Sequence, residues 1–215
     1  MPVLRMILDP NQLPPREIYK HMVACITPRP IAWVSTVNAQ GQTNLAPFSF
    51  FNGVCPNPPT VLFCPTNTRE GRRKDTVRNI EATREFVINI VSDALREKMN
   101  ATSEEFPPDI SEFAACGLAP VPSVKVRPPR VKDSLVQMEC VLHDIVRIGE
   151  GALSGNIVIG RIVLLHASDQ VLDANRNIDP RKLDTIGRMG TNVYCRTRDQ
   201  FELDRPQTKP APEVQ

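Results

Sequence analysis

Apolar residues occur along the chain in short runs with two different spacings. Over 15–25, Ile18, Met22 and Cys25 follow the spacing of one face of a helix, which Pro28 then prevents from continuing. Elsewhere, runs rich in β-branched and aromatic residues are bounded by turn residues, and such runs predict strands. These predicted strands cover 31–37, 42–51, 60–63, 85–91, 135–148, 156–166 and 192–196.

Only short segments of the remaining chain favour helix. Asp75 can cap a helix over 75–83, because its carboxylate accepts amide protons of the first turn. Two more short helices are predicted over 93–102 and 109–116. The 21 prolines disfavour long helices, since each internal proline removes a backbone donor and clashes with the preceding turn. The proline-rich segment 118–132 is therefore predicted to be an extended connection.

This order of elements predicts the fold class. Six or seven strands with one short helical interruption predict a mainly β fold, a closed or nearly closed antiparallel β-barrel with peripheral helices. The length of 215 residues favours a single domain. We expect that domain over 15–205, with an N-terminal arm over 1–14 and a Pro-rich C-terminal tail over 206–215.

Charge and cysteine usage exclude several classes of protein. Lys and Arg number 26 against 24 Asp and Glu, so the chain lacks the strong basic field of proteins that bind nucleic acid or anionic membranes. No apolar stretch approaches the roughly 20 residues that cross a bilayer. The six cysteines form no CxxC pair, and the N-terminus has no basic region followed by an apolar run. We expect a cytoplasmic protein with reduced thiols that binds neither nucleic acid nor membrane.

Several catalytic motifs are missing from the sequence. There is no GxGxxG after a strand, no GxxxxGK[ST], no HExxH and no GxSxG. The three histidines lie far apart in the sequence, so no metal site is expected. His143 and His166 fall within strand-like runs and are interpreted as partly buried strand residues.

The first predicted strand pair is unusually polar. Ser35, Thr36, Asn44, Ser49 and Asn52 lie among apolar residues, and a proline at 47 interrupts the ladder. Hydroxyls and freed backbone groups at this density can bind a phosphate or the polar edge of a planar ring. A solvent-facing polar stripe explains the same pattern, and both interpretations stay open.

A basic segment leads into the helix predicted over 75–83. Residues 69–78 include five basic and two acidic side chains. Helix starts bind anions because free amide protons and the helix dipole point the same way. A solvated charged face is the alternative interpretation of this run.

Blocks in these segments resemble a known family. They are TPRPIAWVSTVNAQGQTNLAPFSFFNGVCPNPPTVLF, KDTVRNI, EFVINIV, VQMECVL, IVIGRIV and GRMGTNVY, in this order. Together they resemble the flavin reductase-like, FMN-binding split-barrel family, in particular its flavoredoxin-type branch. The likeness covers roughly residues 15 to 205, and it implies a homodimer of split barrels with FMN near the dimer interface.

The resemblance also implies the flavin-binding residues of this chain. At the ribityl phosphate end it implies Ser35, Thr36, Asn52, Arg73, Lys74 and Thr76. Along the isoalloxazine it implies Asn44, Ala46, Pro47, Phe48, Ser49 and Phe50. Arg188 and His166 are further flavin-side candidates, with Met189-Gly190 standing where the family has a glycine pair.

The function implied is an NAD(P)H-dependent flavin reductase or an FMN-bound electron-transfer flavoprotein that supplies reduced flavin to a separate monooxygenase. FAD or riboflavin is a less favoured cofactor than FMN. Hydride transfer from the nicotinamide to the flavin needs no side-chain nucleophile, so no catalytic residue is assigned. The alternative is a carrier or sensor that binds FMN without catalysis, since one fold hosts several functions. A nucleic-acid-binding barrel is disfavoured by the near-neutral charge and few aromatic residues.

Overall fold

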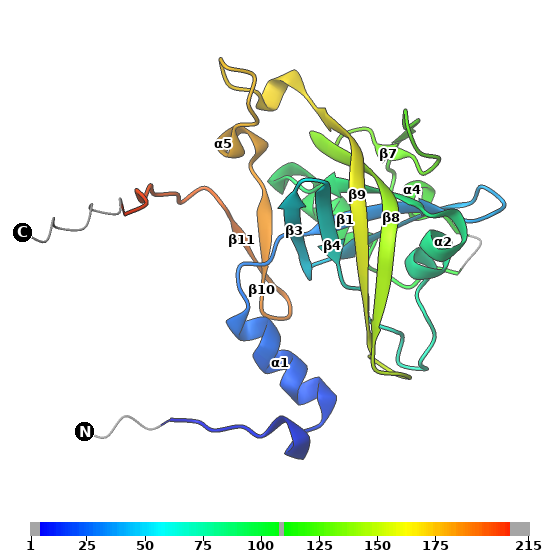
Figure 1. The fold of residues 1–215 in the computed structure, drawn as a ribbon, viewed down its shortest axis with the longest axis vertical. Coiled ribbons are helices and arrows are strands. Elements are labelled where there is room, and N and C mark those ends of the chain that lie inside the picture. The colour runs from blue at the N-terminus through cyan, green and yellow to red at the C-terminus, as the bar shows by residue number, and fades with distance from the viewer. Residues whose placement is uncertain (1–4, 108–109, 207–215) are drawn as a thin grey trace, which may run out of the picture.

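Seven strands form one antiparallel sheet in the computed structural model, which describes residues 5–107 and 110–206 (Figure 1). Their order across the sheet is β2-β1-β5-β8-β9-β4-β3. The strands are β1 (Ala32–Val37), β2 (Thr43–Phe48), β3 (Phe51–Pro56), β4 (Pro59–Phe63), β5 (Glu85–Ile90), β8 (Val136–Ile148) and β9 (Gly155–Ala167).

The sheet curls into a barrel that is split at one corner. β2 and β3 lie at opposite ends of the strand order, yet only Ser49 and Phe50 separate them in the chain. Around this corner the rings of Phe48 and Phe63 have centroids 5.2 Å apart, and the Cys64 N–H donates to the Phe50 carbonyl at 2.8 Å. No ladder joins β2 to β3 in the described part of the chain. The predicted nearly closed antiparallel barrel is therefore confirmed.

Aromatic rings fill the barrel interior. Phe63 and Phe86 are fully buried and meet edge to face, with centroids 5.5 Å apart. Gly160 of β9 lies directly against the Phe86 ring, and a Cβ at this position would be 2.2 Å from Phe86 Cζ. The interior therefore has room for the Phe86 ring only because position 160 carries no side chain.

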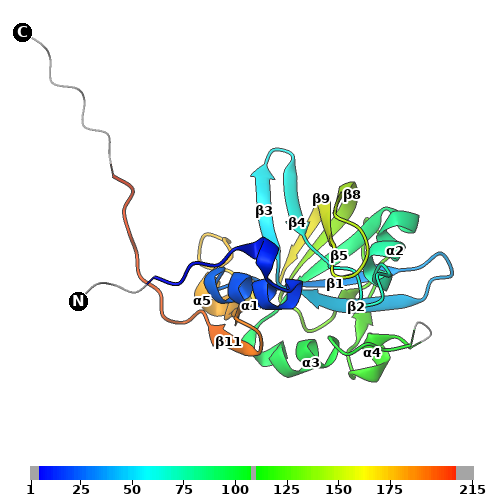
Figure 2. The same ribbon diagram turned by 90° about the horizontal axis from the view of Figure 1, so that it is seen from below.

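Short helices and small hairpins surround the barrel. Figure 2 shows α3 and α4 on the side of β1 and β2, where buried Trp33 packs in a second apolar cluster with Leu45 and Phe113. The Trp33 indole N–H donates to Thr102 Oγ1 at 2.9 Å. The helices are α1 (Pro15–Cys25), α2 (Asp75–Thr83), α3 (Arg96–Ala101), α4 (Glu112–Ala115) and α5 (Pro180–Leu183), and the 3-10 turns cover Pro10–Gln12, Asp93–Leu95 and Asp169–Val171. The hairpins pair β6 (Pro120–Val121) with β7 (Arg130–Val131) and β10 (Ile186–Met189) with β11 (Val193–Arg196).

The predicted elements match the structure with a few corrections. The single strand predicted over 42–51 is wrong, because the chain turns the barrel corner there and forms β2 and β3. Strand β10 was not predicted, and the helix expected over 93–102 begins as a 3-10 turn. Of the helix expected over 109–116 the structure gives α4; position 109 lies outside the described residues, as does most of the predicted tail, 207–215. The division into arm, domain and tail stays a prediction.

Within the described ranges, no helix is long and apolar enough to cross a membrane.

A buried carboxylate holds the proline-rich connection against the outside of the sheet. Glu139 of β8 is fully buried and accepts hydrogen bonds from the backbone N–H groups of Val124, at 2.8 Å, and Lys125, at 2.5 Å. Its Oε1 is also 2.6 Å from Nε2 of His166 on β9. The carboxylate therefore joins the connection to two neighbouring strands.

This cluster predicts an acid-sensitive contribution to stability. Burial alone would raise the pKa of Glu139, but the Val124 and Lys125 N–H groups and His166 outweigh burial and hold the pKa below its ordinary value. Because the pKa is lower in the folded state, the contribution is complete above the unfolded pKa of about 4.3 and is lost as the pH falls through the folded value. We expect Glu139→Gln to be less stable at pH 7 and to lose less stability on acidification than the wild type.

Urea unfolding between pH 3 and pH 7 measures both effects. Glu97→Gln is the control, because the Glu97 side chain is 85% exposed. If the free energy of unfolding of Glu139→Gln falls with pH as steeply as that of the wild type, another carboxylate is responsible for the loss of stability between pH 7 and pH 3.

Candidate functional site

The larger of two adjoining clefts lies between α1 and the split corner of the barrel. Its volume is about 690 Å³, within the roughly 300–1,000 Å³ typical of ligand sites. The corner supplies a largely apolar wall from Pro47 to Phe50, and α1 faces it with Ile18, Tyr19 and Met22. The remaining lining residues are Pro15, Arg16, Cys64, Thr66, Arg69, Lys74, Leu153 and Arg188.

The charge of this cleft has one sign. Arg16, Arg69, Lys74 and Arg188 line it, and none of its lining residues is acidic. Within residues 5–107 and 110–206, none of these four cations forms an ion pair. Cations gathered in a concave surface attract anions, so the cleft favours a negatively charged ligand.

A second cleft, of about 360 Å³, shares Pro47, Phe48 and Lys74 with the first. Here β2 lies beside the start of α2, and Asn44 Nδ2 donates to Thr76 Oγ1 at 3.0 Å. The Leu45 N–H, on the open edge of β2, donates to the Glu112 carboxylate at 2.8 Å. Burial raises the pKa of Glu112. These two bonds fix the edge strand that forms the common wall of both clefts.

Lys74 stands at the start of α2, where backbone donors are free. α2 has nine residues and its cap makes no side-chain hydrogen bond. The first N–H groups of the helix that make a backbone hydrogen bond are those of Val77 and Arg78, which both donate to the Lys74 carbonyl. The neighbouring Arg73 is bound to Glu81, which also accepts from Arg147 at 2.6 Å. Lys74 is therefore the cation at this helix start that is available to an anion.

Arg29 is a buried cation that the sequence reasoning missed. It is 3% exposed, and its guanidinium donates to the carbonyls of Val23, at 2.7 Å, Ile26, at 2.8 Å, and Gly190, at 2.9 Å. Its Cζ lies 5.6 Å from the centre of the Phe50 ring. Burial lowers the pKa of Arg29. One side chain thus fastens the end of α1 and the β10–β11 turn to the barrel corner.

Arg188 is positioned by its own hairpin. Its backbone exchanges hydrogen bonds with Arg29, at 2.8 and 3.0 Å. Its guanidinium lies over the Tyr194 ring, with Cζ 4.6 Å from the ring centre, and donates to the Tyr194 hydroxyl and the Thr191 carbonyl. This arrangement holds Arg188 in place on the lining of the larger cleft.

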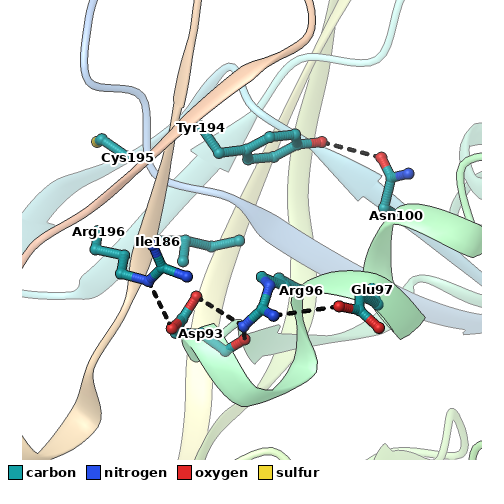
Figure 3. Close-up of a pocket in the computed structure, with 8 residues that line it drawn as sticks. All are labelled: Asp93, Arg96, Glu97, Asn100, Ile186, Tyr194, Cys195 and Arg196. Atoms are coloured by element: carbon teal, nitrogen blue, oxygen red, sulfur yellow. Dashed lines mark hydrogen bonds and ion pairs between the residues drawn. The ribbon is translucent and has the colours of Figure 1, made fainter.

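A cluster of ion pairs fastens the β10–β11 hairpin, which carries Arg188. The cluster lines a small cavity of about 250 Å³ (Figure 3). There Asp93 accepts from Arg96, at 3.2 Å, and from Arg196 of β11, at 2.8 Å. The Tyr194 hydroxyl donates to Asn100 at 3.2 Å. The Arg196 hydrogen bond holds the pKa of Asp93 below its ordinary value.

The structure brings ten of the fourteen predicted flavin residues to the two clefts. The second cleft contains those of β2, of α2 and of the segment just before α2, and the larger one contains those of the corner and β10, with three residues common to both. They are Asn44, Ala46, Pro47, Phe48, Ser49, Phe50, Arg73, Lys74, Thr76 and Arg188.

The other four predicted side chains do not line either cleft. Ser35 is buried and donates to the Pro129 carbonyl at 2.6 Å, whereas Thr36 accepts from Asn79 Nδ2 at 3.0 Å. Successive side chains of a strand point to opposite faces, so these two hydroxyls cannot face one ligand together. Asn52 accepts from the Gly53 N–H at 2.9 Å on the exposed strand β3, and His166 is held by Glu139.

Comparison with known proteins places this geometry among flavin-related folds. The family described as "Flavin reductase like domain" matches residues 23–186. The structure is similar to nitrilotriacetate monooxygenase component B from Bacillus cereus, with a TM-score of 0.88 and 33% identity over 93% of this chain and 99% of that one. It is also similar to the 2-nitrobenzoate 2-nitroreductase NbaA from Pseudomonas fluorescens, with a TM-score of 0.85 and 29% identity over 96% of this chain and 100% of that one.

A more distant structure shares the fold. The flavoredoxin of Desulfovibrio vulgaris (Miyazaki F) aligns with a TM-score of 0.70 at 22% identity, over 83% of this chain and 91% of that one. The family match over residues 23–186 confirms the expected family, and the similar structures confirm the expected fold.

The carbonyl ligands of Arg29 predict the effect of replacing it. Arg29→Lys keeps the charge but cannot reach three carbonyls in different directions, so we expect it to destabilise the fold by about 3 kcal/mol. Urea unfolding measures this change. Arg176→Lys serves as the matched control, because the Arg176 side chain is 77% exposed. Equal stability of the two variants would contradict the role assigned to Arg29.

Proposed function

The chain belongs to the flavin reductase-like family, and from this membership we propose that it is an oxidoreductase that binds FMN and uses NAD(P)H as reductant. The observation that carries the proposal is the larger cleft, in which Lys74 and Arg188 line the same space as a largely apolar wall and no lining residue is acidic. A ligand with a flat ring and a phosphate matches both features.

The residues of the clefts fit FMN at both ends. A phosphate monoester carries about two negative charges at neutral pH, and it would be bound by Lys74 together with the free N–H groups at the start of α2. The wall from Pro47 to Phe50 would take the ring system, with the Phe50 ring fixed beneath Arg29.

The protein's part in such a reaction is binding and electrostatics. The chemistry would be supplied by the bound flavin, which can accept a hydride from a reduced nicotinamide and pass electrons on. Pro47, Phe48 and Phe50 would exclude water from the ring face. The Arg188 guanidinium, held over Tyr194, would stabilise negative charge that develops in the cleft. This assignment requires no side chain to act as nucleophile or to transfer a proton.

We further propose that the protein delivers reduced flavin to a separate monooxygenase. This is supported by the similar protein from Bacillus cereus, which is named as component B of a monooxygenase.

A homodimer is also proposed. Its support is the open edge of β3, the strand that follows the corner, where Val54 is 51% exposed. A cytoplasmic location agrees with six cysteines that are all free thiols.

Lys74→Ala should weaken FMN binding about tenfold or more, because a charge-assisted hydrogen bond to phosphate is removed. Quenching of flavin fluorescence on titration gives the Kd. The control is Lys132→Ala, which replaces an exposed lysine at the end of the proline-rich connection and should bind FMN like the wild type. The phosphate assignment is wrong if both variants bind FMN equally well.

Turnover is tested separately from binding. Protein loaded with FMN is mixed anaerobically with NADH and then with NADPH, and the absorption of the oxidised flavin is followed. Rapid bleaching by at least one nucleotide is the expected result. Binding of FMN without bleaching by either would exclude the reductase and favour a carrier or sensor.

A further inference from the structure

We propose that the α1 side of the larger cleft is a second anion subsite, formed by Arg16 and Arg69, that binds the diphosphate of a dinucleotide. The inference rests on the proposed function, because it assumes that the Lys74 side of the cleft takes the FMN phosphate. It adds the residues that recognise the second ligand and the chemical group they recognise.

The charge of the cleft exceeds what FMN requires. Its lining carries four cations and no acidic side chain. A phosphate monoester brings about two negative charges, so roughly two positive charges remain unbalanced in the cleft. Each bridging phosphate of a dinucleotide carries one negative charge, so a diphosphate would balance them. Arginine suits this role, because its planar group donates two parallel hydrogen bonds to phosphate oxygens.

Arg16 and Arg69 are the two cations of the cleft that have neither a protein partner nor an assigned part in FMN binding. Lys74 stands at the start of α2, and Arg188 is already bound to Tyr194 and Thr191. Arg16 and Arg69 donate no side-chain hydrogen bond and form no ion pair to any residue within the described ranges, and both are exposed. Their guanidinium groups are therefore available to a ligand.

A fixed turn presents Arg69. The turn is closed by hydrogen bonds from the Thr68 N–H to the Arg72 carbonyl, at 2.8 Å, and from the Gly71 N–H to the Thr68 carbonyl, at 3.0 Å. Glu70, the acid nearest in sequence, lies 3.9 Å from Arg72 and does not line the cleft. Glu70 therefore adds no negative charge to the lining of the cleft.

The turn is itself attached to the end of the long β8–β9 hairpin. The Asn67 N–H donates to the Ser154 carbonyl at 2.9 Å, and Asn67 Nδ2 donates to the Gly151 carbonyl at 3.0 Å. A cation on a braced turn loses less freedom when it binds an anion than one on a loose loop.

α1 presents Arg16 beside apolar side chains. Tyr19 and Met22 line the same wall and are 45% and 44% exposed. The Tyr19 ring stands at 89° to the ring of Phe50, with centroids 6.5 Å apart. α1 is held at its far end by the bonds from Arg29 to Val23 and Ile26. An anion subsite next to exposed aromatic and thioether groups matches a ligand that carries a planar base beside its phosphates.

Two dinucleotides present this chemistry, the pyridine nucleotides and FAD. The test compares the double variant Arg16→Gln/Arg69→Gln with Lys20→Gln. Lys20 lies on α1, is exposed and does not line the cleft, so Lys20→Gln removes a charge from the same helix without touching the subsite. Flavin fluorescence gives the Kd values of FMN and FAD, and calorimetry gives the Kd of NAD⁺ and NADP⁺ for FMN-loaded protein. Thermal unfolding confirms that both variants are folded.

We expect the double variant to bind FMN within about twofold of the wild type and at least one dinucleotide class about tenfold more weakly, with a smaller salt dependence. A loss confined to NAD⁺ or NADP⁺ identifies the pyridine nucleotide, and a loss confined to FAD identifies FAD. The inference is overturned if FMN binding weakens as much as dinucleotide binding, if Lys20→Gln shows the same loss, or if wild-type protein binds neither dinucleotide. Failure of the proposed function looks different, since FMN would then not bind or would not be bleached by NADH or NADPH.

Discussion

The buried guanidinium of Arg29 is the interaction on which the candidate site depends. A buried cation is costly unless its donors are satisfied, and here three backbone carbonyls satisfy them. Those carbonyls belong to the end of α1 and to the turn that follows β10, and the Arg29 backbone pairs with Arg188. Arg29 therefore attaches α1 and the β10–β11 hairpin, the two segments that face the barrel corner, to the barrel. The same guanidinium covers the Phe50 ring, so it also fixes the corner itself.

The split in the barrel explains why the cleft forms at this place. A fully closed barrel would engage the backbone of β2 and β3 in a continuous ladder. At the corner the ladder stops, and Ser49 and Phe50 connect the two strands across the gap. The open edge of β2 is then secured by Glu112 and by the Asn44–Thr76 bond. The fold thus exposes a stretch of backbone and apolar side chains to a ligand without leaving the strand unsupported.

Much of the fold and part of the site could be predicted from the sequence. The strands and α2 follow from runs of apolar residues, because these are local signals. The cap predicted at Asp75 is wrong, since Lys74 is the N-cap residue of α2 without a side-chain hydrogen bond, and the Asp75 carboxylate pairs with Arg78 instead. The blocks that resemble a family predicted Lys74 and the wall from Pro47 to Phe50, and the structure places these residues on the lining of the larger cleft. Their contacts with a flavin stay a prediction. Ser35 and Thr36 were not brought to the clefts, because the face to which a strand residue points depends on which face of the strand the barrel buries.

Arg29 could not be found from the sequence, because its partners are carbonyls, which every residue carries, and one of them is 161 positions away. The pairing of His166 with Glu139 depends on the register of β8 and β9, which bulges shift twice. The close contact between Gly160 and Phe86 has a consequence for how such sequences can vary. A larger residue at 160 is compatible with this barrel only together with a smaller one at 86, so substitutions at these two positions should be inherited as a pair.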